Sequence, residues 1–299
     1  MKSVFRALLV PALLWAQPDN PARSIPSAVI SDPVVDRANP PWMGQVLVPS
    51  HGLGMNGLFY IAGGVGPHPT VILLHGFPGT EQNLDLAQAI RRAGWNVLTF
   101  HYRGSWGSPG VFSIGHVLED VDAAVSFVRR PDIAKSYQID PVRIVLGGHS
   151  MGGFAAAAHA RHDVDLAGVL LLDAWNVGMT GDRLSKVARA ELPGAAVKEF
   201  ADLGNSLRGA TPLGVAKEIV LHRAEWNYLA WGPGLVHSPL LVIGASRTYG
   251  EVNRQLAEAV IRAGGKVTSV TLPTDHGFQD HRIALAAEVI NWLEKVSGK

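Results

Sequence analysis

The residues that most clearly suggest chemistry are 148–152 (GHSMG), which follow an apolar run and precede an alanine-rich stretch. A serine that acts as a nucleophile has to stand on a very sharp turn. Glycines two positions before and after it let the flanking strand and helix approach each other closely. This spacing predicts a nucleophile elbow with Ser150 at its tip. A chance match in a chain with 33 glycines is the alternative, but the expected strand before the motif and helix after it argue against chance.

A second segment could stabilise the charge that such a serine creates. Residues 70–74 (TVILL) are typical of a buried parallel strand, and they end in residues 75–79 (HGFPG). A loop at this place can carry a backbone donor for the oxyanion of a tetrahedral intermediate. We predict that the amides of Phe77 and Met151 form this oxyanion hole. His75 and Gly76 are expected to contact the substrate beside it.

A histidine near the C-terminus is the candidate general base. Residues 267–272 (VTSVTL) alternate like a strand and lead to His276, on the loop before the last expected helix. His281 competes for this role, but it lies at the start of that helix and should point less directly at the elbow. His149 lies inside the elbow, where we expect it to be packed or hydrogen-bonded.

The remaining histidines do not suggest a metal. His159 and His162 are three residues apart, but no third ligand and no glutamate stands at the spacing of a metalloprotease helix. The sequence therefore predicts neither a metal site nor a cofactor.

Four segments, taken in chain order, resemble a known family: 75–79 (HGFPG), 102–110 (YRGSWGSPG), 148–153 (GHSMGG) and 274–278 (TDHGF). Together they are similar to the α/β-hydrolases, in the branch of serine esterases and prolyl-oligopeptidase-like enzymes, from residue 45 to the C-terminus. The resemblance implies a triad in the order serine, acid, histidine, with Ser150 as nucleophile and His276 as base. It also implies cleavage of a small-molecule carboxylic ester through an acyl-enzyme.

The acid of this triad departs from the family pattern. The family usually carries an aspartate just after the strand that here comprises residues 240–244, but residues 245–251 (ASRTYGE) contain none. Asp173 directly follows the apolar strand after the elbow, where some lipases of this fold place their acid. Glu251 lies in the expected loop but later than usual, where it could cap a helix. We favour Asp173 over Glu251.

Two other functions stay open. An exported serine peptidase of prolyl-oligopeptidase-like type is suggested by residues 223–228 (RAEWNY) and 102–110, although the chain is too short for a propeller domain. A non-catalytic binding protein on a hydrolase scaffold is suggested by the missing aspartate, because a fold does not fix a function.

Strands and helices alternate along most of the chain, which favours a mainly parallel sheet covered by helices on both faces. Strands are expected at 45–49 and 58–62 as an antiparallel pair, and at 70–74, 96–101, 142–147, 168–172, 240–244 and 267–272. The expected fold class is therefore α/β, an eight-stranded α/β-hydrolase sheet in one domain over residues 42–299.

Residues 176–236 form an insertion between two of these strands. Helices are expected over 182–200 and 211–226, with Gly and Pro at the breaks. In this fold such an insertion usually forms a helical lid that selects the substrate; a long crossover connection is the alternative. Trp175, Trp226 and Trp231 flank the insertion and could line an acyl pocket or anchor the insertion to the core.

The first 16 residues are expected to be a secretory signal. Lys2 and Arg6 precede an apolar segment of about ten residues, shorter than the ~20 residues needed to span a bilayer. Cleavage near Ala16 would release an exported protein, periplasmic or secreted, without stable membrane anchoring, whose residues 17–41 are Pro-rich and extended. N-terminal sequencing of exported material should start at or near Gln17, and a start at Met1 would exclude cleavage.

Composition fits a globular enzyme. With 47% hydrophobic and 17% charged residues, the 299-residue chain can bury one large core, and without cysteines it has to be stable without disulfides. A net charge of +1 and the lack of a basic run argue against nucleic-acid binding.

Overall fold

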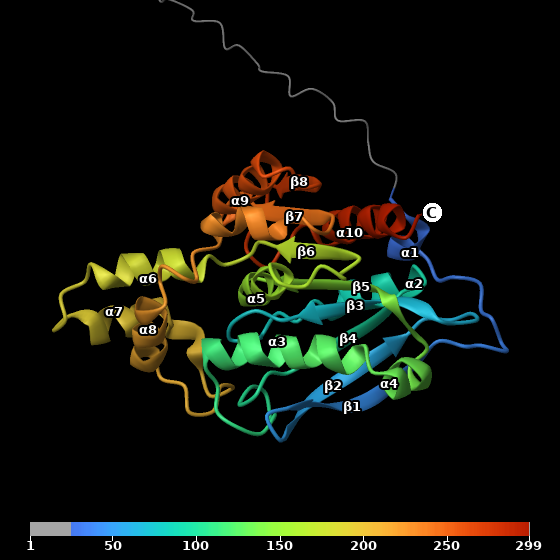
Figure 1. Cartoon of the computed structure of the whole chain (residues 1–299), viewed down its shortest axis with the longest axis horizontal. Coiled ribbons are helices and arrows are strands. Elements are labelled where there is room, and N and C mark those ends of the chain that lie inside the picture. The colour runs from blue at the N-terminus through green and yellow to red at the C-terminus, as the bar shows by residue number, and fades with distance from the viewer. Residues whose placement is uncertain (1–24, 299) are drawn as a thin grey trace, which may run out of the picture.

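The computed structural model describes residues 25–298 and has an eight-stranded sheet at its centre, with helices on both faces (Figure 1). Across the sheet the strands follow the order β1-β2-β4-β3-β5-β6-β7-β8. Their bounds are β1 Trp42–Ser50, β2 Leu53–Ile61, β3 His68–Leu74, β4 Asn96–Phe100, β5 Ile139–His149, β6 Gly168–Leu172, β7 Leu240–Ala245 and β8 Val267–Leu272.

The sheet is parallel from β4 to β8, whereas β2 runs antiparallel to both of its neighbours. Every residue of β3, β6 and β7 is buried. Parallel strands that are covered on both faces need apolar side chains on both sides, which is why these strands read as continuous apolar runs in the sequence. The predicted mostly parallel, eight-stranded architecture is confirmed.

The first two strands are longer than the sequence predicts. β1 and β2 pair without interruption from Trp42 opposite Ile61 to Ser50 opposite Leu53. The connecting residues His51 and Gly52 both have positive φ, +46° and +78°. A two-residue turn of this kind matches the twist of the flanking strands, so pairing can continue up to the turn.

Helices cover the two faces of the sheet unequally. α3, α5 and α9 pack on one face, while α2 and α10 pack on the other, with α1 against them. The bounds of the helices are α1 Ser27–Ile30, α2 Leu84–Arg92, α3 Ile114–Val128, α4 Pro131–Ser136, α5 Met151–Ala160, α6 Val177–Ser185, α7 Leu192–Glu199, α8 Pro212–Leu221, α9 Gly250–Arg262 and α10 Arg282–Val296, with short 3₁₀ helices η1 Ala201–Leu203 and η2 Tyr228–Leu235.

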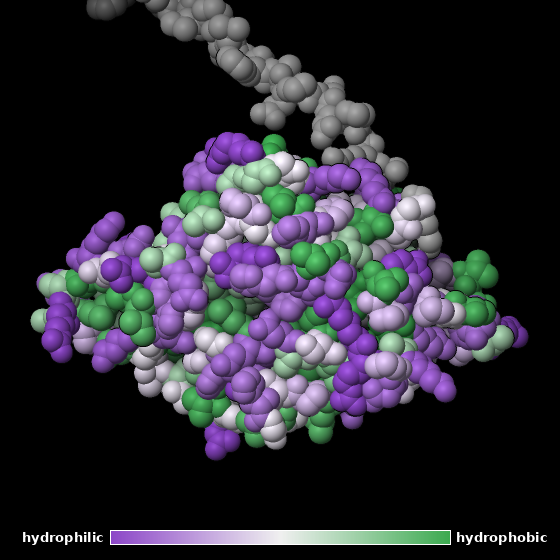
Figure 2. All heavy atoms as spheres, viewed as in Figure 1, coloured by the Kyte–Doolittle hydropathy of each residue, from purple (hydrophilic) through white to green (hydrophobic). Residues whose placement is uncertain are grey.

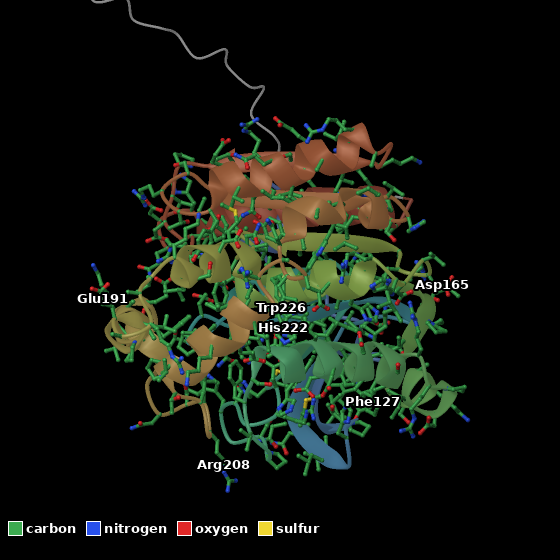
Figure 3. The ribbon with its side chains drawn as sticks, turned by 60° about the vertical axis from the view of Figure 1, so that its left-hand side comes forward. Phe127, Asp165, Glu191, Arg208, His222 and Trp226 are labelled. Atoms are coloured by element: carbon green, nitrogen blue, oxygen red, sulfur yellow. The ribbon has the colours of Figure 1, made fainter. Side chains whose placement is uncertain are left out.

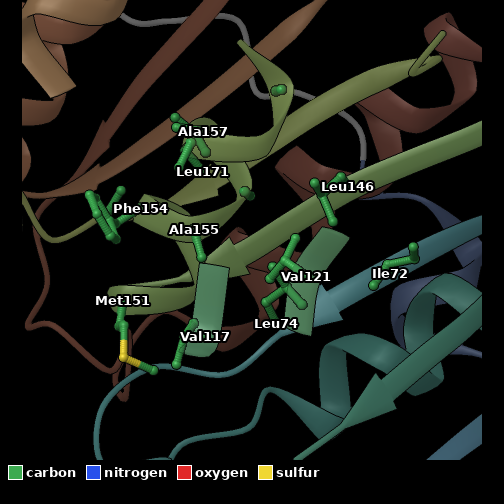
Figure 4. Close-up of a cluster of buried hydrophobic side chains, with 14 of the residues drawn as sticks. Ile72, Leu74, Val117, Val121, Leu146, Met151, Phe154, Ala155, Ala157 and Leu171 are labelled. Atoms are coloured by element: carbon green, nitrogen blue, oxygen red, sulfur yellow. The ribbon is translucent and has the colours of Figure 1, made fainter. Parts of the chain in front are cut away.

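The larger of the two core clusters lies between the sheet and α3 and α5 (Figure 4). Val117 and Val121 of α3 and Leu146 of β5 belong to this cluster, and all three side chains are fully buried. Phe154 of α5 is buried in the same cluster. This packing fixes α5, and with it the turn that precedes α5, against the centre of the sheet.

The insertion at 176–236 carries α6, α7 and α8, which project together from one end of the sheet (Figure 1). The predicted helix over 182–200 is wrong in its bounds, because α6 ends at Ser185 and a separate helix, α7, begins at Leu192. Pro193 lies in the first turn of α7. Proline is tolerated in a first turn but breaks a helix interior, so the single long helix cannot form. Glu191 marks the outer end of this group in Figure 3.

The N-terminal segment also differs from the prediction. Residues 27–30 form the short helix α1 within the segment expected to be extended. The predicted signal, residues 1–16, lies outside the described residues. Within residues 25–298 no helix is long and apolar enough to cross a membrane. Figure 2 shows hydrophilic residues over much of one face, with smaller hydrophobic areas among them.

Candidate active site

Ser150 stands on a strained turn between β5 and α5. Its φ is +56° and its ψ is −118°, a conformation that is rare for a residue with a side chain. The two flanking glycines are required by contact: a Cβ at Gly148 would lie 2.5 Å from the backbone of Gly152, and one at Gly152 would lie 2.4 Å from the carbonyl oxygen of Leu74. The turn thus has the geometry of a nucleophile elbow.

Asp173 and His276 are joined by a hydrogen bond. Asp173 directly follows β6 and is fully buried, and its Oδ2 lies 2.7 Å from Nδ1 of His276, in the loop after β8. An ionised carboxylate can only accept, so Nδ1 carries the proton and Nε2 is left with a free lone pair. The imidazole is therefore in the tautomer that a general base needs.

The serine turn contacts the histidine loop. The ring of His149 lies 4.5 Å from that of His276, and Nε2 of His149 donates to the carbonyl oxygen of His276 at 2.7 Å. The amide of Trp175, two residues after Asp173, donates to the carbonyl oxygen of Ser150 at 3.0 Å. The three segments that carry Ser150, Asp173 and His276 therefore meet at the carboxyl end of the sheet.

His149 and Ser150 differ in their contacts. Burial lowers the pKa of His149 to about 3, so this ring stays neutral and packs against the base loop. For Ser150 Oγ the structure records no hydrogen bond within residues 25–298. Hydrogen bonds to catalytic groups are often long without substrate and tighten when it binds.

Glu251 and His281, the alternative candidates for the acid and the base, lie elsewhere. Glu251 is exposed on α9, where the hydrogen bond from Arg254 lowers the pKa of its carboxyl to about 2. His281 precedes α10, and its Nδ1 lies 3.1 Å from Asp280. The structure records neither residue in contact with Ser150, Asp173 or His276.

The loop that follows β3, in which an oxyanion donor is predicted, passes directly beside the serine. A Cβ at Gly76 would lie 2.9 Å from Cβ of Ser150, so no larger residue fits there. Phe77 follows Gly76, and Met151 is the first residue of α5, where helix amides have no intrahelical partner. Among residues 25–298, neither amide donates a hydrogen bond. Both are thus available to an anion beside Ser150.

His75 holds this loop from behind. Its Nδ1 donates to the carbonyl oxygen of Gly76 at 2.8 Å, its own carbonyl accepts from the Tyr102 hydroxyl at 2.9 Å, and burial lowers its pKa to about 4. His75 lines a cavity of about 650 Å³ formed with residues of β1, β2 and β4. Asp173 and His276 do not line that cavity.

A second pocket, of about 540 Å³, lies beside Tyr249, whose ring contacts that of His276. Its lining residues are Trp175, Asn176, Met179, Thr180, Asp182, Arg183, Lys186, Glu199, Tyr249 and Val252. The Tyr249 ring stands edge-on to that of His276 at 5.1 Å, and the Trp175 ring lies 6.3 Å from that of Phe77. Sequence reasoning missed Tyr249, because one aromatic residue in a loop carries no signal of what it contacts.

The other two tryptophans anchor the insertion. Trp226 and Trp231 are buried against Phe154 of α5, with ring centroids 6.0 and 5.4 Å away. His222 stacks on Trp226 at 4.4 Å at the inner end of the insertion (Figure 3). Of the three tryptophans, Trp175 lines the pocket beside Tyr249.

Residues 71–288 match the model of the alpha/beta hydrolase family. Because this match covers most of the chain, the protein belongs to the alpha/beta hydrolases. The fold is that of this family.

The individual proteins and structures that resemble this chain share limited sequence identity with it. The quorum-quenching protein AidA of Acinetobacter baumannii (strain MDR-ZJ06) is 32% identical over 152 residues, 48% of this chain and 47% of that protein. The chain spans about half the length of the curated relatives it matches. A thermostable carboxyl esterase from Bacillus coagulans superposes with a TM-score of 0.65 at 16% identity, over 85% of this chain and 98% of the esterase. An acylaminoacyl peptidase from Pyrococcus horikoshii superposes with a TM-score of 0.57 at 16% identity, over 86% of this chain and 41% of the peptidase.

Proposed function

We propose that this alpha/beta hydrolase is a serine hydrolase that cleaves carboxylic esters through an acyl-enzyme. The observation that carries the proposal is the hydrogen-bonded pair of Asp173 and His276 beside a strained turn that presents Ser150. A buried carboxylate that orients an imidazole next to a serine is the arrangement that activates a hydroxyl as a nucleophile.

Each group has a role in two similar half-reactions. His276 Nε2 takes the proton of Ser150 Oγ as the oxygen attacks the ester carbonyl, and the amides of Phe77 and Met151 bind the resulting oxyanion. When this intermediate collapses, the C–O bond to the alcohol breaks and the imidazolium returns its proton to the leaving oxygen. Water then attacks the acyl-enzyme with the same base, which releases the acid and restores Ser150.

The charges of the pocket favour an ester over a peptide. A peptidase that binds a free amino terminus needs unpaired carboxylates near the nucleophile. Of the two carboxylates that line the pocket, Glu199 pairs with Arg183 at 2.5 Å and Asp182 lies 3.5 Å from Arg223. A peptidase remains the second candidate, because a peptidase of known structure shares the fold.

We also propose that the insertion acts as a lid that selects the substrate. Met179, Thr180 and Arg183 of α6 line the same pocket as Tyr249, which contacts the ring of His276. Met179 is 44% exposed there, which leaves apolar surface for an acyl or alcohol group.

A fluorophosphonate probe and a series of p-nitrophenyl esters of increasing acyl length test this function. The wild-type protein should bind the probe covalently and hydrolyse the esters, with a rate that depends on acyl length because the pocket is bounded. An aminoacyl p-nitroanilide serves as the comparison. Faster cleavage of the anilide than of every ester would favour the peptidase, and absence of labelling would favour a binding protein.

A further inference from the structure

Residues 245–249, at the end of β7 and in the loop that follows it, bind the carboxylate of Asp173, although they contain no aspartate or glutamate themselves. Asp173 Oδ1 accepts from the amide of Ala245 at 2.9 Å, and Oδ2 accepts from the hydroxyl of Thr248 at 2.6 Å. The amide of Tyr249 lies at the outer limit of a hydrogen bond to Oδ2, at 3.5 Å. A fully buried carboxylate has to replace the hydrogen bonds it loses to water, and residues 245–249 supply most of the replacements.

This loop is fixed to the segment that carries His276. The amide of Ser246 donates to the carbonyl oxygen of Leu272, and that of Arg247 to the carbonyl oxygen of Thr274, at 2.9 and 3.2 Å. The amide of Thr248 closes the turn onto the carbonyl oxygen of Ala245 at 3.1 Å. The Thr248 hydroxyl is therefore held at a defined place relative to both Asp173 and the histidine loop.

Thr248 and His276 bind to the same carboxylate oxygen of Asp173. Both donate to Oδ2 of Asp173, at 2.6 and 2.7 Å, whereas Oδ1 accepts from Ala245. We propose that Thr248 is a positioning residue, whose hydroxyl aims Oδ2 at Nδ1 of His276 and takes up part of the negative charge that this oxygen presents to the imidazole. The inference rests on the proposed function, in which this pair activates Ser150.

Loss of the Thr248 hydroxyl should change both the rate and its pH dependence. Without the second donor, Oδ2 is less firmly aimed, so fewer molecules hold the productive imidazole orientation. The carboxylate charge is also shared less, so it stabilises the imidazolium more and His276 keeps its proton to higher pH. The acid limb of kcat/KM should therefore move to higher pH.

The titratable side chains around the Asp173–His276 pair are His149, Tyr228 and Tyr249. The charged groups are Arg282 and two ion pairs farther out, Arg247–Asp280 and Arg183–Glu199. Burial lowers the pKa of His149 to about 3, raises that of Tyr249 to about 12 and raises that of Tyr228 well above its usual value. A shift of the acid limb therefore reports on the Asp173–His276 pair.

The test compares Thr248→Val, Thr248→Ser and the control Ser246→Ala. Valine has nearly the shape of threonine but cannot donate, serine restores the hydroxyl, and Ser246 is an exposed residue of the same loop without a recorded side-chain bond to Asp173. Thr248→Val should lower kcat/KM about tenfold, as expected for a lost hydrogen bond to a charged group, and move the acid limb up by about half a pH unit. Thr248→Ser should recover both, and Ser246→Ala should match the wild type.

A limb that stays in place or moves to lower pH in Thr248→Val would overturn the proposal, as would an equal shift in Ser246→Ala. A second readout does not depend on turnover. The NMR titration of the His276 ring should move to higher pH in Thr248→Val and return in Thr248→Ser. If the wild type is not labelled by the fluorophosphonate, the proposed function fails, but this titration still decides the role of Thr248.

The same geometry allows the acid to be moved. A carboxylate at position 248 would place an oxygen about 1.2 Å beyond the present hydroxyl, toward the place that Oδ2 of Asp173 now occupies. Asp173→Gly opens that space and suits the positive φ of +41° at this residue. The double variant Asp173→Gly, Thr248→Asp should therefore hydrolyse esters at least about tenfold faster than Asp173→Gly alone. If the double variant has the same melting temperature as Asp173→Gly but hydrolyses esters no faster, the position assigned to Thr248 relative to His276 is wrong.

Discussion

Replacing Ser150 with alanine is expected to abolish ester turnover and covalent labelling by a fluorophosphonate. In the proposed mechanism every turnover passes through an ester bond to Ser150 Oγ, and loss of such a nucleophile lowers kcat by about 10⁶ in serine proteases. The variant should fold normally, because Ser150 Oγ has no recorded hydrogen bond to lose within residues 25–298. Steady-state rates, probe labelling followed by mass spectrometry and thermal melting measure these three expectations.

The matched control is Ser246→Ala, which removes a serine hydroxyl from an exposed loop near the site. This variant should keep wild-type turnover and labelling. Labelling that persists in Ser150→Ala would place the nucleophile at another residue. Labelling lost together with the thermal transition would show a folding defect, and Ser150→Gly, which lacks the hydroxyl and tolerates the positive φ, would then separate the two effects.

The central strands could be predicted because their environment leaves a clear pattern. β6 and β8 begin and end at the predicted residues, Gly168–Leu172 and Val267–Leu272. β6 is apolar throughout because both of its sides are covered, whereas β8 at the sheet edge alternates because one side is partly exposed. In both cases burial of the side chains determines the residue types.

The insertion could be located but not resolved into its helices. Its position follows from the strands on either side, but the bounds of α6 depend on contacts that a sequence window does not contain. The side chain of Asn176 accepts from the amide of Met179 and caps α6, which begins at Val177, five residues before the predicted residue 182. The break before α7 depends on Pro193, a residue inside the predicted helix.

The candidate site was predictable where motifs are local and not where partners come from distant loops. The glycines around Ser150 and the loop at Phe77 carry their geometry in a few adjacent residues. The bond from Thr248 to Asp173 joins residues 75 apart in sequence, and the edge-on contact of Tyr249 with His276 also joins two different loops. No periodicity or spacing in one sequence indicates such a pair.

Asp173→Asn is expected to lower turnover by up to about 10⁴ while keeping the fold. Asparagine has the shape of aspartate and tolerates the left-handed backbone of residue 173, whose φ is +41°. Both oxygens of the Asp173 carboxylate accept hydrogen bonds, but the asparagine amide replaces one of them with an NH₂ group that can only donate. His276 therefore loses the negatively charged acceptor that fixes its tautomer and stabilises its protonated form. In serine proteases the same change costs about 10⁴ in kcat with the geometry intact.

Glu251→Gln is the matched control, because it makes the same chemical change at the other candidate acid. Glu251 is exposed and bound to Arg254 and Gln255 on α9, so its loss should leave turnover within about twofold of the wild type and change stability little, as is usual for surface substitutions. The turnover of one p-nitrophenyl ester is measured for both variants, after thermal melting has shown that they are equally stable. The variant that loses turnover identifies the acid. If Asp173→Asn keeps wild-type turnover and Glu251→Gln loses it, the hydrogen bond between Asp173 and His276 is structural and Glu251 is the acid.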